Sequence, residues 1–309
     1  MTDQATAVTG FTTAVDAAWG DPAVWTAHGQ QWTHLDRVRQ TINRRVTGDP
    51  HVAPLTWFFR AVDQEHGLPL TRVLVLGCGS MGIETEIALA GWAQDIIAID
   101  LSPRALAIAA AKSQAAGLTS VTHMQADMNA LPLGAHGFEP GSFDAIISIS
   151  GVHHCANLEG LYAACAKLLK PQGWFYLDEF VGPSRFQWPE VQVGLINGFL
   201  AALPEAYLRT AHGHIRRGYL RPTVDQVIAV DPSEAVRSTD LLPLLSLWFS
   251  VHVVRGYGGN LLHLALAEIA QNFHTDQDGY LERLIDLEGW CLAERLLVDD
   301  FAVIMARNR

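Results

Sequence analysis

Short apolar runs alternate with helical patterns through the middle of the chain, between residues 71 and 178. The runs are rich in branched side chains and have the length of buried strands, and the segments between them have the spacing of amphipathic helices. The expected strands are 72–76, 95–100, 121–125, 143–149 and 174–178, and the expected helices are 82–90, 103–116 and 158–169. Strict alternation of this kind predicts an α/β protein with a parallel, doubly wound sheet.

The flanking segments have other patterns. Residues 1–66 read as helical, and they hold four of the nine tryptophans, Trp19, Trp25, Trp32 and Trp57. Helix starts are expected where an acid precedes a proline, at Asp21-Pro22, Asp49-Pro50 and Asp231-Pro232. A turn is expected at 170–173, a sixth strand at 247–254, helices at 260–273 and 280–296, and a seventh strand at 301–306.

These patterns divide the chain into four parts. We predict an N-terminal helical lid at 1–66, a cofactor-binding core at 67–180, a helical substrate cap inserted at 181–246, and a final part at 247–309 that completes the sheet. Insertions that close over a cleft commonly determine substrate specificity. The two helices before the last strand offer a surface on which two copies could form a homodimer.

Composition narrows the classes of partner and the compartment. The formal net charge of −11, from 21 basic and 32 acidic residues, argues against nucleic acid as a substrate. The four cysteines stand far apart, which is typical of reduced thiols in the cytoplasm. Residues 1–10 lack the pattern of a signal peptide, and the longest apolar run, 241–254, is too short and too polar to span a membrane. We therefore expect a cytoplasmic protein that binds neither membranes nor nucleic acid.

A glycine turn, Gly77-x-Gly79-x-x-Gly82, joins the first expected strand to its helix. Such a turn lets a cofactor lie against the backbone and a helix N-terminus. Asp100 ends the second expected strand, where a carboxylate can accept hydrogen bonds from a ribose diol. Taken alone, these residues fit NAD and S-adenosylmethionine (SAM) equally well.

Four segments, in the right order and spacing, resemble the motifs of class I SAM-dependent methyltransferases. They are 73–79, 125–127, 143–147 and 168–177, and one departure is that Gly82 stands one residue later than in the usual Gly-x-Gly-x-Gly. Shorter segments at 178–188, 231–237 and 255–259 resemble bacterial small-molecule methyltransferases. The resemblance implies a Rossmann-like seven-stranded sheet, SAM as cofactor and methyl transfer to a small molecule.

The resemblance also implies where SAM would bind. Gly77 and Gly79 would approach its methionine part, Asp100 its ribose hydroxyls and Asp127 its adenine amine. The full set of expected cofactor-binding residues is Gly77, Cys78, Gly79, Asp100, Leu101, Asp127, Met128 and Ser148.

Candidate catalytic groups stand at the ends of the fourth and fifth expected strands. His153 and His154 follow the fourth strand, and Glu179 follows Asp178 at the end of the fifth. Because successive residues of a strand face opposite ways, only one of these two acids should face inward. We predict Glu179 as the proton acceptor or acceptor anchor, with His154 and His153 as alternatives. Residues 148–154 lack the Asn/Asp-Pro-Pro-Tyr-like segment that is typical of amine methyltransferases acting on nucleic acids.

Four cap arginines are the predicted substrate-binding residues: Arg185, Arg216, Arg217 and Arg237. Arginine binds carboxylates and phosphates in two-point contacts, so a small anionic acceptor is expected, with a prenyl diphosphate as one option. Whether carbon, oxygen or nitrogen is methylated stays open. His212 and His214 have no further ligand at a diagnostic spacing, so no metal site is predicted. The alternative functions are an NAD-dependent oxidoreductase and a non-catalytic SAM-binding protein.

Overall fold

The computed structural model describes residues 2–27, 29–135 and 137–309, without the side chains of residues 2–9 and 25, so the Trp25 side chain lies outside the described part. Seven strands form one sheet in the order β3-β2-β1-β4-β5-β7-β6. They are β1 (Leu70–Leu76), β2 (Ala93–Asp100), β3 (Val121–Gln125), β4 (Phe143–Ile149), β5 (Leu169–Phe180), β6 (Phe249–Gly258) and β7 (Phe301–Asn308). The first five are parallel, and β7 runs antiparallel to both β5 and β6. The predicted seven-stranded, doubly wound sheet is confirmed.

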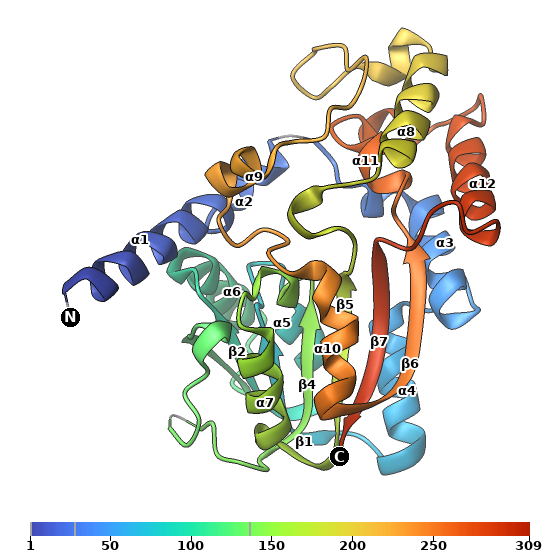
Figure 1. The fold of residues 1–309 in the computed structure, drawn as a ribbon. Coiled ribbons are helices and arrows are strands. Elements are labelled where there is room, and N and C mark those ends of the chain that lie inside the picture. Colours follow the sequence, from blue (N-terminus) through green and yellow to red (C-terminus); the bar gives the residue numbers. More distant parts are fainter. Residues whose placement is uncertain (1, 28, 136) are drawn as a thin grey trace.

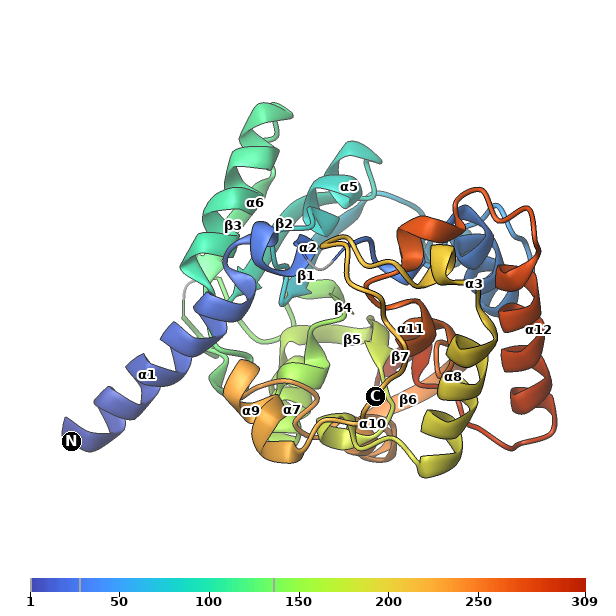
Figure 2. The same ribbon diagram turned by 90° about the horizontal axis from the view of Figure 1, so that it is seen from above.

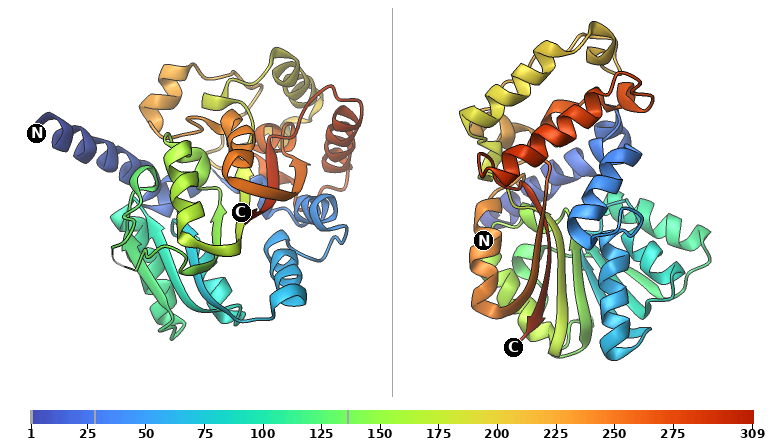
Figure 3. Two further views of the ribbon diagram at one scale, coloured as in Figure 1. Left: turned by 60° about the horizontal axis from the view of Figure 1, so that its bottom comes forward. Right: turned by 90° about the vertical axis from the view of Figure 1, so that its right-hand side faces the viewer.

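Helices cover both faces of the sheet (Figures 1 and 3). One face carries α4 (Pro54–His66), α5 (Ile83–Leu89) and α6 (Pro103–Ala115), and the other carries α7 (Leu158–Leu168) and α10 (Leu241–Trp248). Alternation along β1 supplies both cores, because Val73 and Val75 belong to the first and Leu74 and Leu76 to the second. Burial on both faces explains why β1 is a continuous apolar run.

The remaining helices gather above the carboxyl ends of the parallel strands (Figures 1 and 2). From the N-terminal part come α1 (Thr2–Trp19), α2 (Pro22–Thr26), η1 (Trp32–His34) and α3 (Asp36–Thr47). The cap contributes η4 (Ser184–Phe186), α8 (Glu190–Ala202), η5 (Glu205–Leu208), α9 (Val224–Val230) and η6 (Ser238–Asp240). Between β6 and β7 lie α11 (Leu262–Leu266), η7 (Ala270–Phe273) and α12 (Tyr280–Ala293). Two further turns, η2 (Met128–Ala130) and η3 (Val152–His154), follow β3 and β4.

Two of the three expected helix starts are wrong. The first is correct, since α2 begins at Pro22 and Asp21 Oδ1 accepts the Ala23 N–H at 2.9 Å. Asp49 instead accepts the N–H of His51 in a turn, and α4 begins only at Pro54. Asp231 follows the end of α9 and is buried, so it starts no helix.

Three further expectations need correction. The expected turn at 170–173 lies inside β5 as a register shift against β4, with Gln172 at φ +61°. The sixth strand begins at Phe249 and continues to Gly258, since α10 occupies the preceding residues. The expected helix at 260–273 breaks into α11 and η7 because Glu268 takes a left-handed conformation, φ +64°. The longer β6 matters most, because it brings Tyr257 to the carboxyl edge of the sheet.

Within the described part of the chain, no helix is long and apolar enough to cross a membrane. The four cysteines are all free and buried. Burial raises the pKa of the Cys78 thiol far above its ordinary value, so this neighbour of the glycine turn is uncharged.

Candidate active site

A cavity of about 540 Å³ lies at the carboxyl edge of the sheet, beneath α1 and the cap. Its walls come from the loops after β1 to β5, from η1 and from the adjoining ends of β6 and β7. In open α/β sheets ligands bind in this position, outside the carboxyl ends of the strands where the strand order reverses. The volume is in the usual range for a small-molecule site, roughly 300–1,000 Å³.

The glycine turn after β1 forms one wall of the cavity. Gly77 has φ +59°, and a Cβ there would lie 3.2 Å from the Cα of Gly151, so a side chain would be both strained and crowded. Gly79 also has a positive φ, +55°, and lines the cavity. Gly82 has another role, because it is the left-handed residue from which α5 begins. The late third glycine is therefore a helix-start residue.

Two carboxylates at strand ends face the same part of the cavity. Asp100 Oδ2 accepts the Gly79 N–H at 2.8 Å, and its Oδ1 accepts the Ser102 N–H at 2.8 Å. Burial raises the pKa of Asp100, although these two N–H groups oppose that shift. Asp127 caps η2, with Oδ1 accepting the Asn129 N–H at 2.8 Å. Each carboxylate oxygen has two lone pairs, so both acids keep acceptor capacity for a ribose diol or an adenine amine.

Seven of the eight predicted cofactor residues line the cavity: Gly77, Cys78, Gly79, Asp100, Leu101, Asp127 and Met128. Ser148 does not. It is fully buried in β4, and its single O–H is shared between two acceptors, Glu179 Oε1 at 3.1 Å and the Leu76 carbonyl at 3.3 Å. The seven that do line it form a glycine turn with two nearby acceptors, which fits the shape and polarity of an adenosyl group.

Glu179, the predicted proton acceptor, lies beneath the loop after β4 and is fully buried. Its Oε1 accepts the N–H groups of Gly151 at 2.8 Å and Val152 at 2.6 Å, and its Oε2 lies 2.8 Å from His153 Nδ1. Burial would raise the pKa of Glu179, but His153 and these N–H groups outweigh it and lower the pKa. Glu179 is therefore an ionised group that positions the η3 loop, and the expectation that it faces the acceptor is wrong.

Asp178, its neighbour, lines the cavity instead. Its Oδ1 accepts the hydroxyl of Tyr257 at 2.7 Å. Burial raises the pKa of Asp178 to about 7, with a further contribution from the charge of Glu179, although the Tyr257 hydrogen bond opposes the shift. A carboxyl group that titrates near neutrality inside a cavity is suited to accept a proton.

His153 and His154 both line the cavity, side by side, with ring centroids 4.2 Å apart. His154 Nδ1 lies 3.0 Å from Ser233 Oγ and 3.4 Å from Asp231 Oδ2. Burial alone would lower the pKa of His154, but the carboxylates of Glu234, Asp231 and Glu179 raise it to about 9. At neutral pH His154 thus carries a proton and is a poor base.

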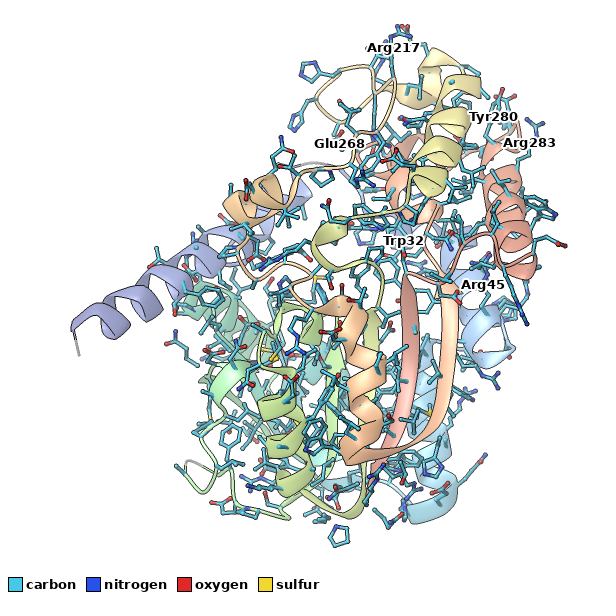
Figure 4. The ribbon with its side chains drawn as sticks, in the orientation of Figure 1. Trp32, Arg45, Arg217, Glu268, Tyr280 and Arg283 are labelled. Atoms are coloured by element: carbon cyan, nitrogen blue, oxygen red, sulfur yellow. The ribbon has the colours of Figure 1, made fainter. Side chains whose placement is uncertain are left out.

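Aromatic side chains line much of the rest of the cavity, among them Trp32, Phe180, Phe186, Tyr257 and Phe301. Trp32 lies above the ends of β6 and β7, beneath the cap (Figure 4), and its ring centroid is 5.4 Å from that of Phe301. Trp19, from the end of α1, lines the opposite side, and its Nε1 donates to Asp231 at 2.6 Å. No local pattern predicts these two contacts, because Phe301 and Asp231 stand more than 200 residues away from Trp32 and Trp19.

None of the four predicted substrate-binding arginines lines the cavity. Arg185 donates to the carbonyls of Pro232 and Glu234 at 2.9 and 3.0 Å, and Arg216 to those of Ala265 and Leu264 at 2.8 and 2.7 Å. Arg217 pairs with Glu205 at 2.9 Å at the far tip of the cap (Figure 4). Arg237 pairs with Glu159 at 2.7 Å and with Asp240 at 2.9 Å. These guanidinium groups are engaged by carbonyls and carboxylates of the protein itself, so the argument for an anionic acceptor loses its support.

Comparison with known proteins supports a cofactor site at the part of the cavity formed by the glycine turn, Asp100 and Asp127. Residues 74–177 match the family model described as a methyltransferase domain. These residues therefore form a class I SAM-dependent methyltransferase domain. SAM is thus the cofactor that the glycine turn, Asp100 and Asp127 would hold, and the NAD alternative falls away.

Curated relatives of this methyltransferase domain include ubiquinone biosynthesis O-methyltransferases. The one from Burkholderia vietnamiensis is 35% identical over 118 residues, which is 38% of this chain and 47% of that protein. The one from Leptothrix cholodnii is 31% identical over 124 residues, 40% of this chain and 49% of that protein. The chain thus spans about half the length of the curated relatives it matches.

Among solved structures, a SAM-dependent methyltransferase from Mesorhizobium loti is similar with a TM-score of 0.44 and 21% identity, covering 82% of this chain and 97% of that one. A phosphoethanolamine N-methyltransferase from Haemonchus contortus, in complex with SAM, has a TM-score of 0.46 and 17% identity, covering 89% and 58%.

Proposed function

We propose that this protein transfers the methyl group of SAM to a hydroxyl of an uncharged small molecule that carries an aromatic or other flat apolar ring. The observation that carries the proposal is the position of Asp178 and its raised pKa. It lies at the end of β5, next to the loop after β4, and its backbone carbonyl accepts the Ser150 N–H at 2.8 Å. Asp178 thus stands between the glycine turn and the aromatic part of the cavity.

SAM, when bound, would supply a methyl group on a sulfonium, whose carbon a nucleophile attacks in line as the carbon–sulfur bond breaks and S-adenosylhomocysteine leaves. The residues of this chain then have two tasks, alignment of the acceptor and removal of its proton. Asp178, in its ionised form, accepts the hydroxyl proton as the oxygen becomes methylated, and it later releases that proton to solvent. Tyr257 fixes the carboxylate in place through its hydroxyl.

The lining of the acceptor half supports a neutral, apolar substrate. Trp32, Phe186 and Phe301 offer flat apolar surfaces, and Asp178, in the ionised form that accepts a proton, would repel an anion. The relatives named as O-methyltransferases favour oxygen as the acceptor atom. None of the cap arginines lines the cavity, so they could not bind the diphosphate of a prenyl diphosphate there, and we do not favour that acceptor.

The test is methyl transfer from isotope-labelled SAM to a panel of acceptors, with the products identified by mass. The panel contains neutral phenols and hydroxylated polycyclic compounds, matched carboxylates, amines, sugar nucleotides and prenyl diphosphates. We expect label on an oxygen of a neutral aromatic compound. Label only in anionic products contradicts the proposed acceptor, and tight binding of S-adenosylhomocysteine without any transfer favours a non-catalytic SAM-binding protein.

A further inference from the structure

Three side chains at one side of the cavity form a cluster of metal-ligating type. One ring nitrogen each from His153 and His154 and one carboxylate oxygen of Glu234 lie within 4.8 Å of one another. The histidines belong to η3, after β4, and Glu234 belongs to the cap loop after α9. Folding therefore brings the three together from two segments that are about 80 residues apart in the sequence.

The ring of His153 is held as a metal ligand usually is. Its Nδ1 is engaged by the carboxylate of Glu179 at 2.8 Å, which leaves Nε2 directed at Glu234 Oε1, 3.5 Å away. Histidines that bind metals almost always have their other ring nitrogen on a carboxylate or a carbonyl, which fixes the tautomer and the ring orientation. Glu179 is itself immobilised by two backbone N–H groups, so this support is rigid.

His154 has the same arrangement. Its Nδ1 contacts Ser233 Oγ at 3.0 Å, and that hydroxyl donates to Asp231 Oδ1 at 2.6 Å. Each histidine thus has its own carboxylate behind it, Glu179 for His153 and Asp231 for His154. Two adjacent histidines that are both supported in this way are not needed to hold the η3 turn, since Glu179 already accepts its backbone N–H groups.

Glu234 supplies the third observation. Its Oε1 is buried and has no hydrogen-bond partner among the described residues, although buried carboxylate oxygens are normally paired. The backbone on either side is fixed by Arg185, which donates to the carbonyls of Pro232 and Glu234. This carboxylate oxygen thus has no hydrogen bond and faces two imidazoles whose other ring nitrogens are already engaged, and a metal ion bound between them would take the place of the proton on His154.

We propose that His153, His154 and Glu234 bind one divalent first-row transition-metal ion, of which Zn²⁺ is the representative. Two imidazoles and one carboxylate suit zinc, iron or nickel better than magnesium, which prefers oxygen ligands. The three side chains line the cavity, so the remaining coordination positions of the ion are open to it. The sequence predicted no metal site because only His212 and His214 were weighed as ligands. Glu234 is about 80 residues from His153 and His154, so no spacing pattern connects the three.

The test uses metal binding by the whole chain, without SAM. Protein stripped with a chelator is titrated calorimetrically with Zn²⁺, and with Co²⁺ while the visible absorption of the bound ion is recorded. We expect one equivalent of each ion to bind. His154→Ala and the isosteric Glu234→Gln should each weaken binding at least tenfold, a typical loss for a removed ligand or its support.

Matched substitutions outside the cavity serve as controls. His252→Ala and Glu205→Gln replace exposed residues of the same types and should leave metal affinity unchanged. Stoichiometric binding that is unchanged in both His154→Ala and Glu234→Gln overturns the proposal, as does wild-type protein that binds no equivalent of either ion. Titration of the metal-free protein with S-adenosylhomocysteine tests the cofactor half separately, so a failed metal site and a failed methyltransferase assignment give different results.

Discussion

At the scale of single residues, the two acids at the end of β5 have opposite roles. Glu179 accepts two backbone N–H groups beneath the η3 loop, whereas Asp178 lines the cavity and titrates near neutrality. A base must be ionised to accept a proton. We therefore expect kcat/KM to rise with pH to a plateau above about 7, falling about tenfold per pH unit below it.

Substitution isolates that role. Asp178→Asn keeps an oxygen for the Tyr257 hydroxyl but cannot take up a proton, so kcat should fall by about 10²–10⁴-fold. Affinity for S-adenosylhomocysteine should stay within a few-fold of wild type. Asp225→Asn, an exposed acid of α9, is the matched control. A normal kcat in Asp178→Asn, or a flat pH profile from 6 to 8, assigns the proton to another group or to water.

Asp100 has two structural partners and, by our interpretation, a ligand as well. Asp100→Ala removes the acceptor for Gly79 and Ser102 together with that for the ribose diol. Because hydrogen bonds to a charged group contribute about 1.5–3 kcal/mol each, we expect S-adenosylhomocysteine to bind at least about tenfold more weakly. Calorimetric titration measures this, with Asp95→Ala at the other end of β2 as control. Unchanged affinity in Asp100→Ala would remove Asp100 from the cofactor site.

The residues differ in how far sequence alone could place them. The glycine turn, Asp100 and Asp127 follow from local strand and helix patterns, and the structure puts them at the cavity. The roles of Asp178 and Glu179 were predicted the wrong way round. Alternation along β5 says that the two side chains face opposite ways, but which of them faces the cavity depends on where a loop distant in sequence covers the strand. The cap arginines were misjudged for a similar reason. Arg216, for example, is satisfied by carbonyls of Leu264 and Ala265, 48 and 49 residues away.

At the scale of elements, α1 is fastened over the cavity by a few polar contacts. Trp19 Nε1 donates to Asp231, Asp16 pairs with Arg104 at 2.6 Å, and Phe11 and Val15 face the cavity. Asp231 lies in the same loop as Glu234, so the lid helix contacts the segment that completes the histidine cluster. Figure 2 shows α1 on the side of α6, away from α8 and α12, so few other elements hold it.

Trp19→Phe tests whether the hydrogen bond from Trp19 to Asp231 holds α1 over the cavity. Phenylalanine keeps an aromatic ring but loses the N–H donor, a loss of about 0.5–1.5 kcal/mol for one hydrogen bond. We expect S-adenosylhomocysteine to dissociate about 2- to 10-fold faster, because α1 opens more often. Stopped-flow release measures the rate. Trp290→Phe, an exposed tryptophan of α12, is the control, and equal release rates in the two variants would show that α1 does not retain the cofactor.

The sequence predicts the order of the strands and helices better than it predicts the residues at which they begin and end. Five parallel strands were placed by their apolar runs, because burial on both faces leaves a clear signal. The lid and cap rest on contacts between distant segments, such as α3 with β6 and α8 with α11, which no local pattern reveals. That difference explains why acid-proline pairs at 49 and 231 were mistaken for helix starts.

At the scale of the whole molecule, Asp300 joins the sheet to the cap. It precedes β7, and its Oδ2 accepts the Trp188 Nε1–H at 2.9 Å and the Gln192 amide at 2.8 Å. Burial raises the pKa of Asp300 to about 7, against the effect of these hydrogen bonds. The cap therefore rests on a carboxyl group that changes charge in the physiological range.

The sign of the effect on stability follows from this pKa. The folded state holds the Asp300 proton up to about pH 7, whereas the unfolded chain releases it near the ordinary value of 3.8. Between these values the folded state binds more protons, so this group's contribution to stability is complete below about pH 4 and is lost as pH rises towards 7. The loss is up to about 1.4 kcal/mol per pH unit.

Asp300→Asn should remove that dependence while keeping an oxygen for Trp188 and Gln192. Other groups also titrate, notably His263, whose pKa burial lowers to about 4 and whose contribution has the opposite sign. The measurement is therefore the difference in unfolding free energy between Asp300→Asn and wild type at pH 5, 6, 7 and 8. It should shift in favour of the variant as pH rises and then level off above 7. A difference that stays constant from pH 5 to 8 would mean that Asp300 is ionised throughout, and that Trp188 and Gln192 of the cap donate to a charged carboxylate.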